Sequence, residues 1–257
     1  MIEFIDSNLL ILNMKLKKLY FVFFCLILSA LSGQWAIAES QSNLTSRYEF
    51  YTPSIDATGK VFMGREIAHV MGFQGAAWLE RQNRVSEERT DILVKSLNLI
   101  SGMYIADIGA GTGFLSREIA KLVGERGQVF AVDIQPEMVG KLKNLQKTYR
   151  NITPILATDH KTNLAPNSAD LAIMVDVYHE LAYPFEVIQD TMQALKKNGR
   201  LVLVEYRGED NNVPIKSSHK MTEAQIIKEM RGHGLQHEKT IKSLPWQHIV
   251  IFTKPQH

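Results

Sequence analysis

A glycine-rich stretch stands between an expected strand and an expected helix. It reads D-I-G-A-G-T-G from Asp107 to Gly113, and a helical pattern begins at Phe114. Glycine at such a turn tolerates positive φ and lets the backbone come close to a ligand. The next expected strand ends at Asp133, where a carboxylate can accept two hydrogen bonds from a ribose diol. Together these residues predict a site for a nucleoside-bearing cofactor at the carboxyl ends of the strands.

The glycine spacing bears on which cofactor fits. A dinucleotide fingerprint has its third glycine where this chain has Phe114. Asp107, two residues before the first glycine, would repel a pyrophosphate but suits a ligand with ammonium and sulfonium charges. A nicotinamide-dependent oxidoreductase is therefore the weaker alternative, and a non-catalytic ligand-binding protein of the same fold is another.

The loop and Asp133 resemble motif I of the class I S-adenosylmethionine-dependent methyltransferases, whose loop reads D-x-G-x-G-x-G. The resemblance covers residues 86–254. It implies S-adenosylmethionine as the cofactor and methyl transfer to an unidentified small-molecule acceptor as the activity. The residues that it assigns to the cofactor site are Asp107, Gly109, Ala110, Gly111, Gly113, Asp133, Ile134, Asp159 and Asp176.

The resemblance also implies a role for individual residues of this set. Asp107 and Gly109 would lie beside the methionine moiety, and Gly111 and Gly113 would leave the ligand room. Asp159 is the candidate to contact the adenine end of the cofactor. The alternative is that Asp159 is a solvent-facing acid of a loop.

A candidate for the acceptor side follows the fourth expected strand, in the run from Asp176 to Leu181. Methyl transfer needs alignment, plus a base where the acceptor must lose a proton. Resemblance to some small-molecule O-methyltransferases implies that His179 is this catalytic base, and a helix cap or a packing residue is the alternative. An unperturbed imidazole titrates near pH ~6.5, so turnover is expected to rise there.

We expect no resident metal. Asp176 and Glu205 end neighbouring strands and could hold a divalent ion. Metal-dependent catechol-type methyltransferases also have an Asp-Asn pair at the second strand, which is absent here because Tyr206 and Arg207 follow Glu205.

A set of basic residues could select an anionic acceptor or form structural ion pairs with Glu66, Glu80 and Glu205. This set consists of Arg65, Arg81, Arg207 and Lys220.

Short apolar runs alternate with helical patterns through most of the chain. The expected strands are Met103–Asp107, Gln128–Asp133, Thr153–Ala157, Leu171–Asp176, Arg200–Glu205, Glu238–Leu244 and Gln247–Thr253. The helices between them are bounded by Gly124, Pro136, Gly199 and a capping box at Thr222 with Gln225. This pattern predicts a Rossmann-like, doubly wound α/β fold with a mostly parallel seven-stranded sheet and an antiparallel C-terminal strand pair.

Three regions are expected. Residues 1–38 form a signal peptide, residues 39–85 an N-terminal leader with lid helices, and residues 86–257 the S-adenosylmethionine-binding methyltransferase domain. Residues 39–60 are polar and without period, which indicates a loosely packed leader, and the pattern from Arg65 to Leu99 is mostly helical.

The first residues have the order of a secretory signal. Lysines at 15, 17 and 18 precede an apolar run from Leu19 to Leu28, and Ala36-Ile37-Ala38 offers cleavage after Ala38, with Met14 as the natural start. An uncleaved membrane anchor is the alternative, although a span needs about 20 apolar residues. We therefore expect a periplasmic or secreted protein that has lost its single cysteine, Cys25, which excludes disulfide and thiolate chemistry.

Composition limits the classes of partner. The chain has 257 residues, 45% apolar and 22% charged, with a net charge of +2. This is a globular composition, and the near-neutral charge excludes a nucleic-acid binder that depends on a basic surface. The expected partner is a small-molecule acceptor, with membrane contact only through an uncleaved signal segment and the oligomeric state left open.

Overall fold

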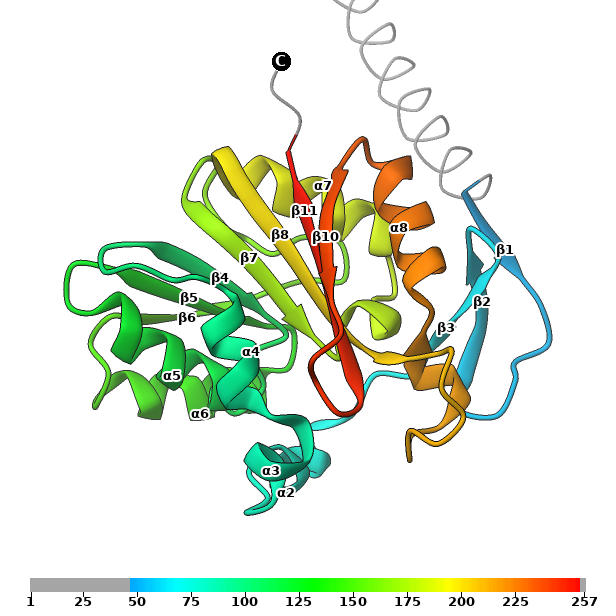
Figure 1. Cartoon of the computed structure of the whole chain (residues 1–257), viewed down its shortest axis with the longest axis horizontal. Helices are drawn as coiled ribbons and strands as arrows, with labels where there is room; N and C mark the ends of the chain where they lie inside the picture. The colour runs from blue at the N-terminus through cyan, green and yellow to red at the C-terminus, as the bar shows by residue number, and fades with distance from the viewer. Residues whose placement is uncertain (1–46, 255–257) are drawn as a thin grey trace, which may run out of the picture. The chain divides into compact units, whose positions relative to one another are not determined.

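The computed structural model describes residues 47–254 (Figure 1). The expected signal segment, residues 1–38, lies outside them. The chain divides after Glu49 into two units, and the second, Phe50–His257, holds the central sheet and its helices. Within residues 47–254, no helix is long and apolar enough to cross a membrane.

A central sheet of mostly parallel strands organises the fold. The strands follow the order β10-β11-β8-β7-β4-β5-β6, with β9 (Lys220–Met221) beside β8. The parallel members are β4 (Tyr104–Ile108), β5 (Gln128–Asp133), β6 (Ile152–Leu156), β7 (Ala169–Val175) and β8 (Leu195–Arg207). The antiparallel members are β10 (Gln236–Ile241) and β11 (Gln247–Thr253). The Rossmann-like fold predicted from the sequence is confirmed.

Helices cover both faces of this sheet, because its strands are apolar on both sides. One core cluster joins the strands to α4 (Thr90–Ser96), α5 (Phe114–Val123) and α6 (Pro136–Gln146). A second cluster joins them to α7 (Pro184–Ala194) and α8 (Glu223–Gly232). Neighbouring residues of one strand face opposite clusters, as Ile105 and Ala106 do in β4.

The helix boundaries follow local sequence signals with one exception. Gly124 ends α5 with φ 66°, Pro136 opens α6, and the Thr222 side chain accepts the Gln225 backbone N–H at 3.1 Å to cap α8. The helix expected to end near Gly199 stops at Ala194, because β8 already begins at Leu195 and pairs with β7.

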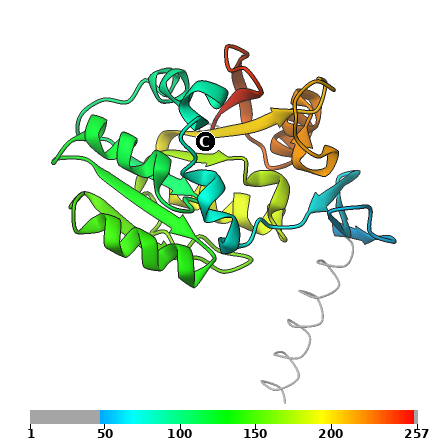
Figure 2. The ribbon, with the colours of Figure 1, turned by 90° about the horizontal axis from the view of Figure 1, so that it is seen from below.

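The segment before α4 differs from the prediction. β2 (Ala57–Phe62) and β3 (Arg65–Ala68) form an antiparallel hairpin where a loose leader and a helix were expected. In Figure 2 the blue hairpin lies on the other side of the molecule from the green helices α5 and α6. The remaining elements before α4 are β1 (Tyr48–Phe50), η1 (Phe73–Gly75), α2 (Ala76–Leu79) and α3 (Arg84–Glu88).

Candidate active site

The glycine loop leaves the carboxyl end of β4 and enters α5. Gly109, Gly111 and Gly113 have φ of 73°, 56° and 82°, values that favour glycine. A Cβ at Gly113 would lie 2.5 Å from the Leu145 side chain, so this glycine allows α5 to pack on α6. A Cβ at Gly111 would lie 2.7 Å from the Leu79 side chain on a cavity wall. Of these two, Gly111 is therefore the one that keeps ligand space open.

Asp133, at the end of β5, lies beside this loop. Its Oδ2 accepts the backbone N–H of Gly111 at 2.8 Å, and its Oδ1 accepts that of Gln135 at 2.9 Å. Burial raises the pKa of Asp133, and these backbone hydrogen bonds oppose the rise. A carboxylate has about four acceptor positions, and the backbone N–H groups of Gly111, Gln135 and Ile134 occupy some of them. The loop thus fixes the orientation of the Asp133 carboxylate, and its contact with a ribose diol stays a prediction.

A cavity of about 660 Å³ opens at the carboxyl ends of the strands. The predicted site residues that line it are Gly109, Gly111, Asp133, Ile134, Asp159, Asp176 and His179. Of the described residues, Asp107, Ala110 and Gly113 do not line it. The hairpin and α2 contribute to the wall through Ile67 and Leu79. The sequence therefore predicted many of the cavity residues at the strand ends, whereas those of the hairpin and α2 were not predicted.

Asp107 lies behind the glycine loop rather than on the cavity wall. It is 3% exposed, and its Oδ2 accepts the Ser116 hydroxyl at 2.5 Å. Burial raises the pKa of Asp107 to about 6, against the hydrogen bond from Ser116 and the charge of Arg84. Direct contact with the methionine part of a cofactor stays a prediction.

Asp176, directly after β7, has a left-handed backbone with φ 54°. Its Oδ2 accepts the Gln247 side-chain amide at 3.0 Å, and its Oδ1 is buried with no hydrogen-bond partner in the described part of the chain. Burial and the charges of Glu88 and Glu205 raise the pKa of Asp176 well above its ordinary value. A strained acid with one unpaired oxygen on a cavity wall is typical of a functional site.

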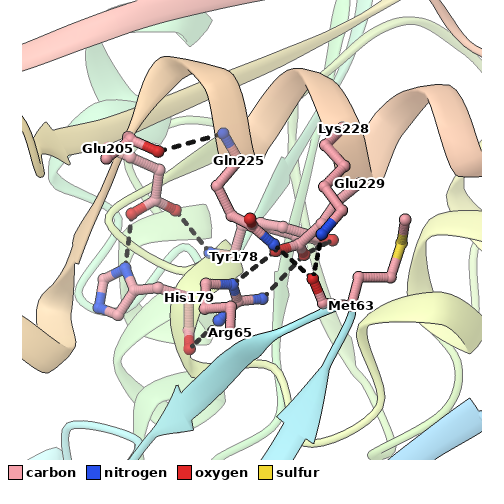
Figure 3. Close-up of polar contacts among 9 residues, drawn as sticks. Met63, Arg65, Tyr178, His179, Glu205, Gln225, Lys228 and Glu229 are labelled. Atoms are coloured by element: carbon pink, nitrogen blue, oxygen red, sulfur yellow. Dashed lines mark hydrogen bonds and ion pairs between the residues drawn. The ribbon is translucent and has the colours of Figure 1, made fainter.

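His179 belongs to the short helix η2 (Tyr178–Glu180) and is 2% exposed. Its Nδ1 lies 2.5 Å from Glu205 Oε2, and Glu205 Oε1 accepts the Tyr178 backbone N–H at 2.9 Å (Figure 3). Burial lowers the pKa of His179, but Glu205 and Glu180 outweigh this effect and raise it to about 10. The expected titration near pH ~6.5 is therefore wrong, whereas the role as base stays a prediction.

Two neighbours of His179 were not among the predicted site residues. Glu180 lines the cavity and its Oε2 accepts the Met71 backbone N–H at 3.0 Å. His219, in η3 (Ser217–His219), lines it too, with Nδ1 3.1 Å from His179 Nε2. The two histidines are 40 positions apart, so no sequence spacing indicates their contact.

The basic residues considered for acceptor selection form structural contacts. Arg65 pairs with Glu229 through Nε–Oε1 at 2.8 Å and Nη2–Oε2 at 3.0 Å, and its Nη1 donates to the His179 carbonyl at 3.2 Å (Figure 3). The Tyr178 hydroxyl donates to Glu229 Oε2 at 2.6 Å, and Gln225 donates to Glu229 Oε1 at 2.8 Å. This buried network, Arg65, Tyr178, Gln225 and Glu229, ties the hairpin to η2 and α8.

The other basic residues are also engaged, with partners that the sequence did not indicate. Arg81 pairs with Glu87 at 2.7 Å and with Glu88 at 2.5 Å. Arg207 donates to the backbone carbonyls of Leu244, Pro245 and Gln247. Lys220 donates to the Asp210 carbonyl at 3.2 Å.

Comparison with known proteins identifies the family of this fold. A family model described as "Methyltransferase domain" matches residues 99–249, and the chain belongs to this family. It is a member of the class I S-adenosylmethionine-dependent methyltransferase superfamily. S-adenosylmethionine, which the glycine loop and Asp133 predicted, is the cofactor of this superfamily.

Curated relatives match over part of their length. The ubiquinone/menaquinone biosynthesis C-methyltransferase UbiE of Pseudomonas aeruginosa is 31% identical over 116 residues, which is 44% of this chain and 45% of UbiE. The UbiE of Coxiella burnetii is 29% identical over 119 residues, 45% of this chain and 48% of that protein. The match thus spans about half the length of these relatives.

Solved structures show the same fold at low identity. A SAM dependent methyltransferase from Aquifex aeolicus superimposes with a TM-score of 0.68 and 21% identity, covering 72% of this chain and 99% of that one. The [4+2]-cyclase SpnF does so with a TM-score of 0.55 and 15% identity, covering 65% of this chain and 81% of its own. Because a cyclase shares the fold, the fold alone does not identify the reaction.

Proposed function

We propose that this chain transfers the methyl group of S-adenosylmethionine to a small-molecule acceptor. One observation carries the proposal: a single cavity of about 660 Å³ is lined by the cofactor candidates Gly111 and Asp133 and also by His179. Sites for small ligands have volumes of roughly 300–1,000 Å³. A cavity of this size supports a small acceptor beside the cofactor.

The residues present fit the cofactor. Asp133 lines the cavity with a carboxylate that can accept from ribose hydroxyls, and Asp159 is on the wall for the adenine end. The unpaired Oδ1 of Asp176 can face a positively charged part of the ligand. When bound, the cofactor supplies a methyl group on a sulfonium.

The chain itself has a limited chemical task. Transfer from a sulfonium needs no covalent enzyme intermediate, so the protein positions the acceptor and excludes water. His179 is the candidate to contact the acceptor, because it lines the cavity and Glu205 fixes its ring through Nδ1, while Nε2 lies 3.1 Å from His219 Nδ1. The hairpin residues Ile67 and Ala68 close part of the same cavity.

Calorimetric titration of S-adenosylmethionine tests the cofactor site. Asp133→Ala removes charge-assisted hydrogen bonds worth about 1.5–3 kcal/mol each, so affinity should fall at least roughly tenfold. Glu118→Gln, in the exposed Lys121–Glu118 pair on α5, is the matched control and should bind as the wild type does. Equal affinity of Asp133→Ala and the wild type would show that the site is misplaced, and tighter binding of NADH would favour the oxidoreductase alternative.

Turnover separates an enzyme from a binding protein. Radiolabelled methyl groups should pass to at least one member of a panel of small hydroxyl, amine, thiol and carbon acceptors. Quinone precursors belong in this panel, since the UbiE relatives are named for ubiquinone and menaquinone biosynthesis. Cofactor binding without transfer to any member would support the non-catalytic alternative.

We also propose that the chain is exported, as the residues before Glu39 indicate. The lysines at 15, 17 and 18, the apolar run that follows and the Ala36-Ile37-Ala38 triplet support this proposal. A membrane-anchored form is the alternative.

A further inference from the structure

Donor atoms of His179, Glu180 and His219 form a compact set on the cavity wall, and as a set they have no task in the site described above. His179 Nε2 lies 3.1 Å from His219 Nδ1 and 3.6 Å from Glu180 Oε1, and His219 Nδ1 lies 3.4 Å from Glu180 Oε1. Three atoms with these separations lie on a circle with a radius of about 2 Å. An ion slightly above their plane would lie at roughly the 2.0–2.2 Å that zinc keeps from imidazole nitrogen and carboxylate oxygen.

We propose that His179, Glu180 and His219 bind a divalent transition-metal ion of the zinc type. The three donor atoms lie within 4.8 Å of one another. Two imidazoles with one carboxylate suit zinc and its first-row neighbours, whereas magnesium and calcium prefer oxygen donors alone. This site revises the sequence-based expectation of no metal, and it uses neither of the acids, Asp176 and Glu205, considered there as a metal pair.

The surroundings hold the donors in place. Glu205 Oε2 lies 2.5 Å from His179 Nδ1, so this nitrogen keeps its proton toward Glu205, and a bound ion takes the place of the proton on Nε2. A carboxylate behind a metal-bound histidine is the usual outer partner of zinc. The second oxygen of Glu180 accepts the Met71 N–H at 3.0 Å, which orients the remaining oxygen toward the histidines.

The local charge also favours a dication. Glu180 and Glu205 bring two carboxylates to His179, and an ion of charge +2 balances them. Two basic groups nearby are paired with other acids, Arg65 with Glu229 at 2.8 Å and Lys216 with Asp56 at 2.8 Å.

Three protein ligands leave coordination positions open, and all three residues line the cavity. This is the arrangement of a catalytic rather than a structural metal site. Its use in catalysis rests on the proposed function: the ion would bind an acceptor hydroxyl or thiol and lower its pKa. The proton leaves to solvent, and the anion forms a bond to the methyl carbon as the carbon–sulfur bond breaks, its electron pair staying on the sulfur.

Metal titration of the tag-free full chain after chelator dialysis tests the site directly. We expect one Zn²⁺ per chain by calorimetry, and Co²⁺ should give the visible absorption of a low-coordinate site. His219→Ala and Glu180→Gln should weaken binding at least roughly 100-fold, and Glu205→Gln by about 10–100-fold. His237→Gln is the control, because that ring contacts Thr240 at 2.9 Å on β10, and it should bind as the wild type does.

Two results would overturn the site. One is wild-type protein that binds no Zn²⁺ saturably, and the other is folded His219→Ala, checked by circular dichroism, that binds Zn²⁺ as tightly as wild type. S-adenosylmethionine affinity is measured on the same samples. Cofactor binding without Zn²⁺ binding rejects the metal site alone, whereas Zn²⁺ binding without cofactor binding rejects the proposed function alone.

Discussion

Burial of Asp107, directly before the glycine loop, makes the charged form of its carboxyl group energetically costly. Its carboxyl group is 3% exposed, and burial raises its pKa to about 6. A group whose pKa is higher in the folded state binds its proton more tightly there. Its contribution to stability is therefore complete below the unfolded pKa of about 3.9 and is lost as the pH rises through about 6.

Comparison with Asp107→Asn should reveal this pH dependence. The unfolding free energy of the wild type, minus that of the variant, should fall by about 2 kcal/mol between pH ~4 and ~7, since each pKa unit corresponds to about 1.36 kcal/mol and part of the unfolded-state titration lies below pH ~4. Denaturant titrations across this range, without cofactor, measure the difference. Other carboxylates titrate equally in both proteins and cancel, and a difference that stays constant with pH would contradict the prediction.

A buried network contributes to the attachment of the hairpin to the rest of the fold. Arg65 of β3 meets Glu229 of α8, whose side chain is completely buried, and Tyr178 of η2 joins them (Figure 3). Removal of one partner leaves the other charge buried without compensation, which is costlier than the net worth of the pair. The hairpin covers part of the cavity, so this network also maintains the site.

Glu229→Ala should lower the unfolding free energy by about 3–5 kcal/mol. The control is Lys242→Ala. It breaks the 2.6 Å ion pair between the exposed Lys242 and Glu223, the first residue of the same helix α8, and should cost less than about 1 kcal/mol. Chemical denaturation of both variants measures the contrast. Similar small losses in the two would mean that the network does not hold the hairpin.

The predictability of the elements follows from how they are buried. The parallel strands could be recognised because both of their faces are apolar, as Ile173 and Met174 of β7 show: both are completely buried, and they face opposite core clusters. The hairpin was missed because its strands are short and only partly buried, and the strand state of Arg65–Ala68 comes from pairing with β2. Glycine and proline signals located most helix ends, but not that of α7, where pairing with β7 prevails.

The site residues also differ in how far the sequence alone can predict them. Gly111 and Asp133 lie where two strands end, and topology brings such ends together in every fold of this type. His219 comes from η3, between β8 and α8, and reaches His179 only through the course of that connection. Local patterns do not contain that information.

At the scale of the whole chain, export makes a prediction about the N-terminus. Protein isolated from the producing cells should begin at Glu39, because the Ala36-Ile37-Ala38 triplet precedes that residue. N-terminal sequencing of the extracytoplasmic fraction measures this. A full-length chain recovered from membranes would make the protein an anchored enzyme, and a full-length chain in the cytosol would reject export.

The Arg65–Glu229 contact joins residues 164 positions apart, and this distance along the chain affects the order of folding. Closing so long a loop costs chain entropy before the contact forms, and folds rich in such contacts fold slowly. The parallel strands can pair while the hairpin is still undocked. We therefore expect the chain to acquire the ability to bind its ligand late in refolding, after its sheet has formed.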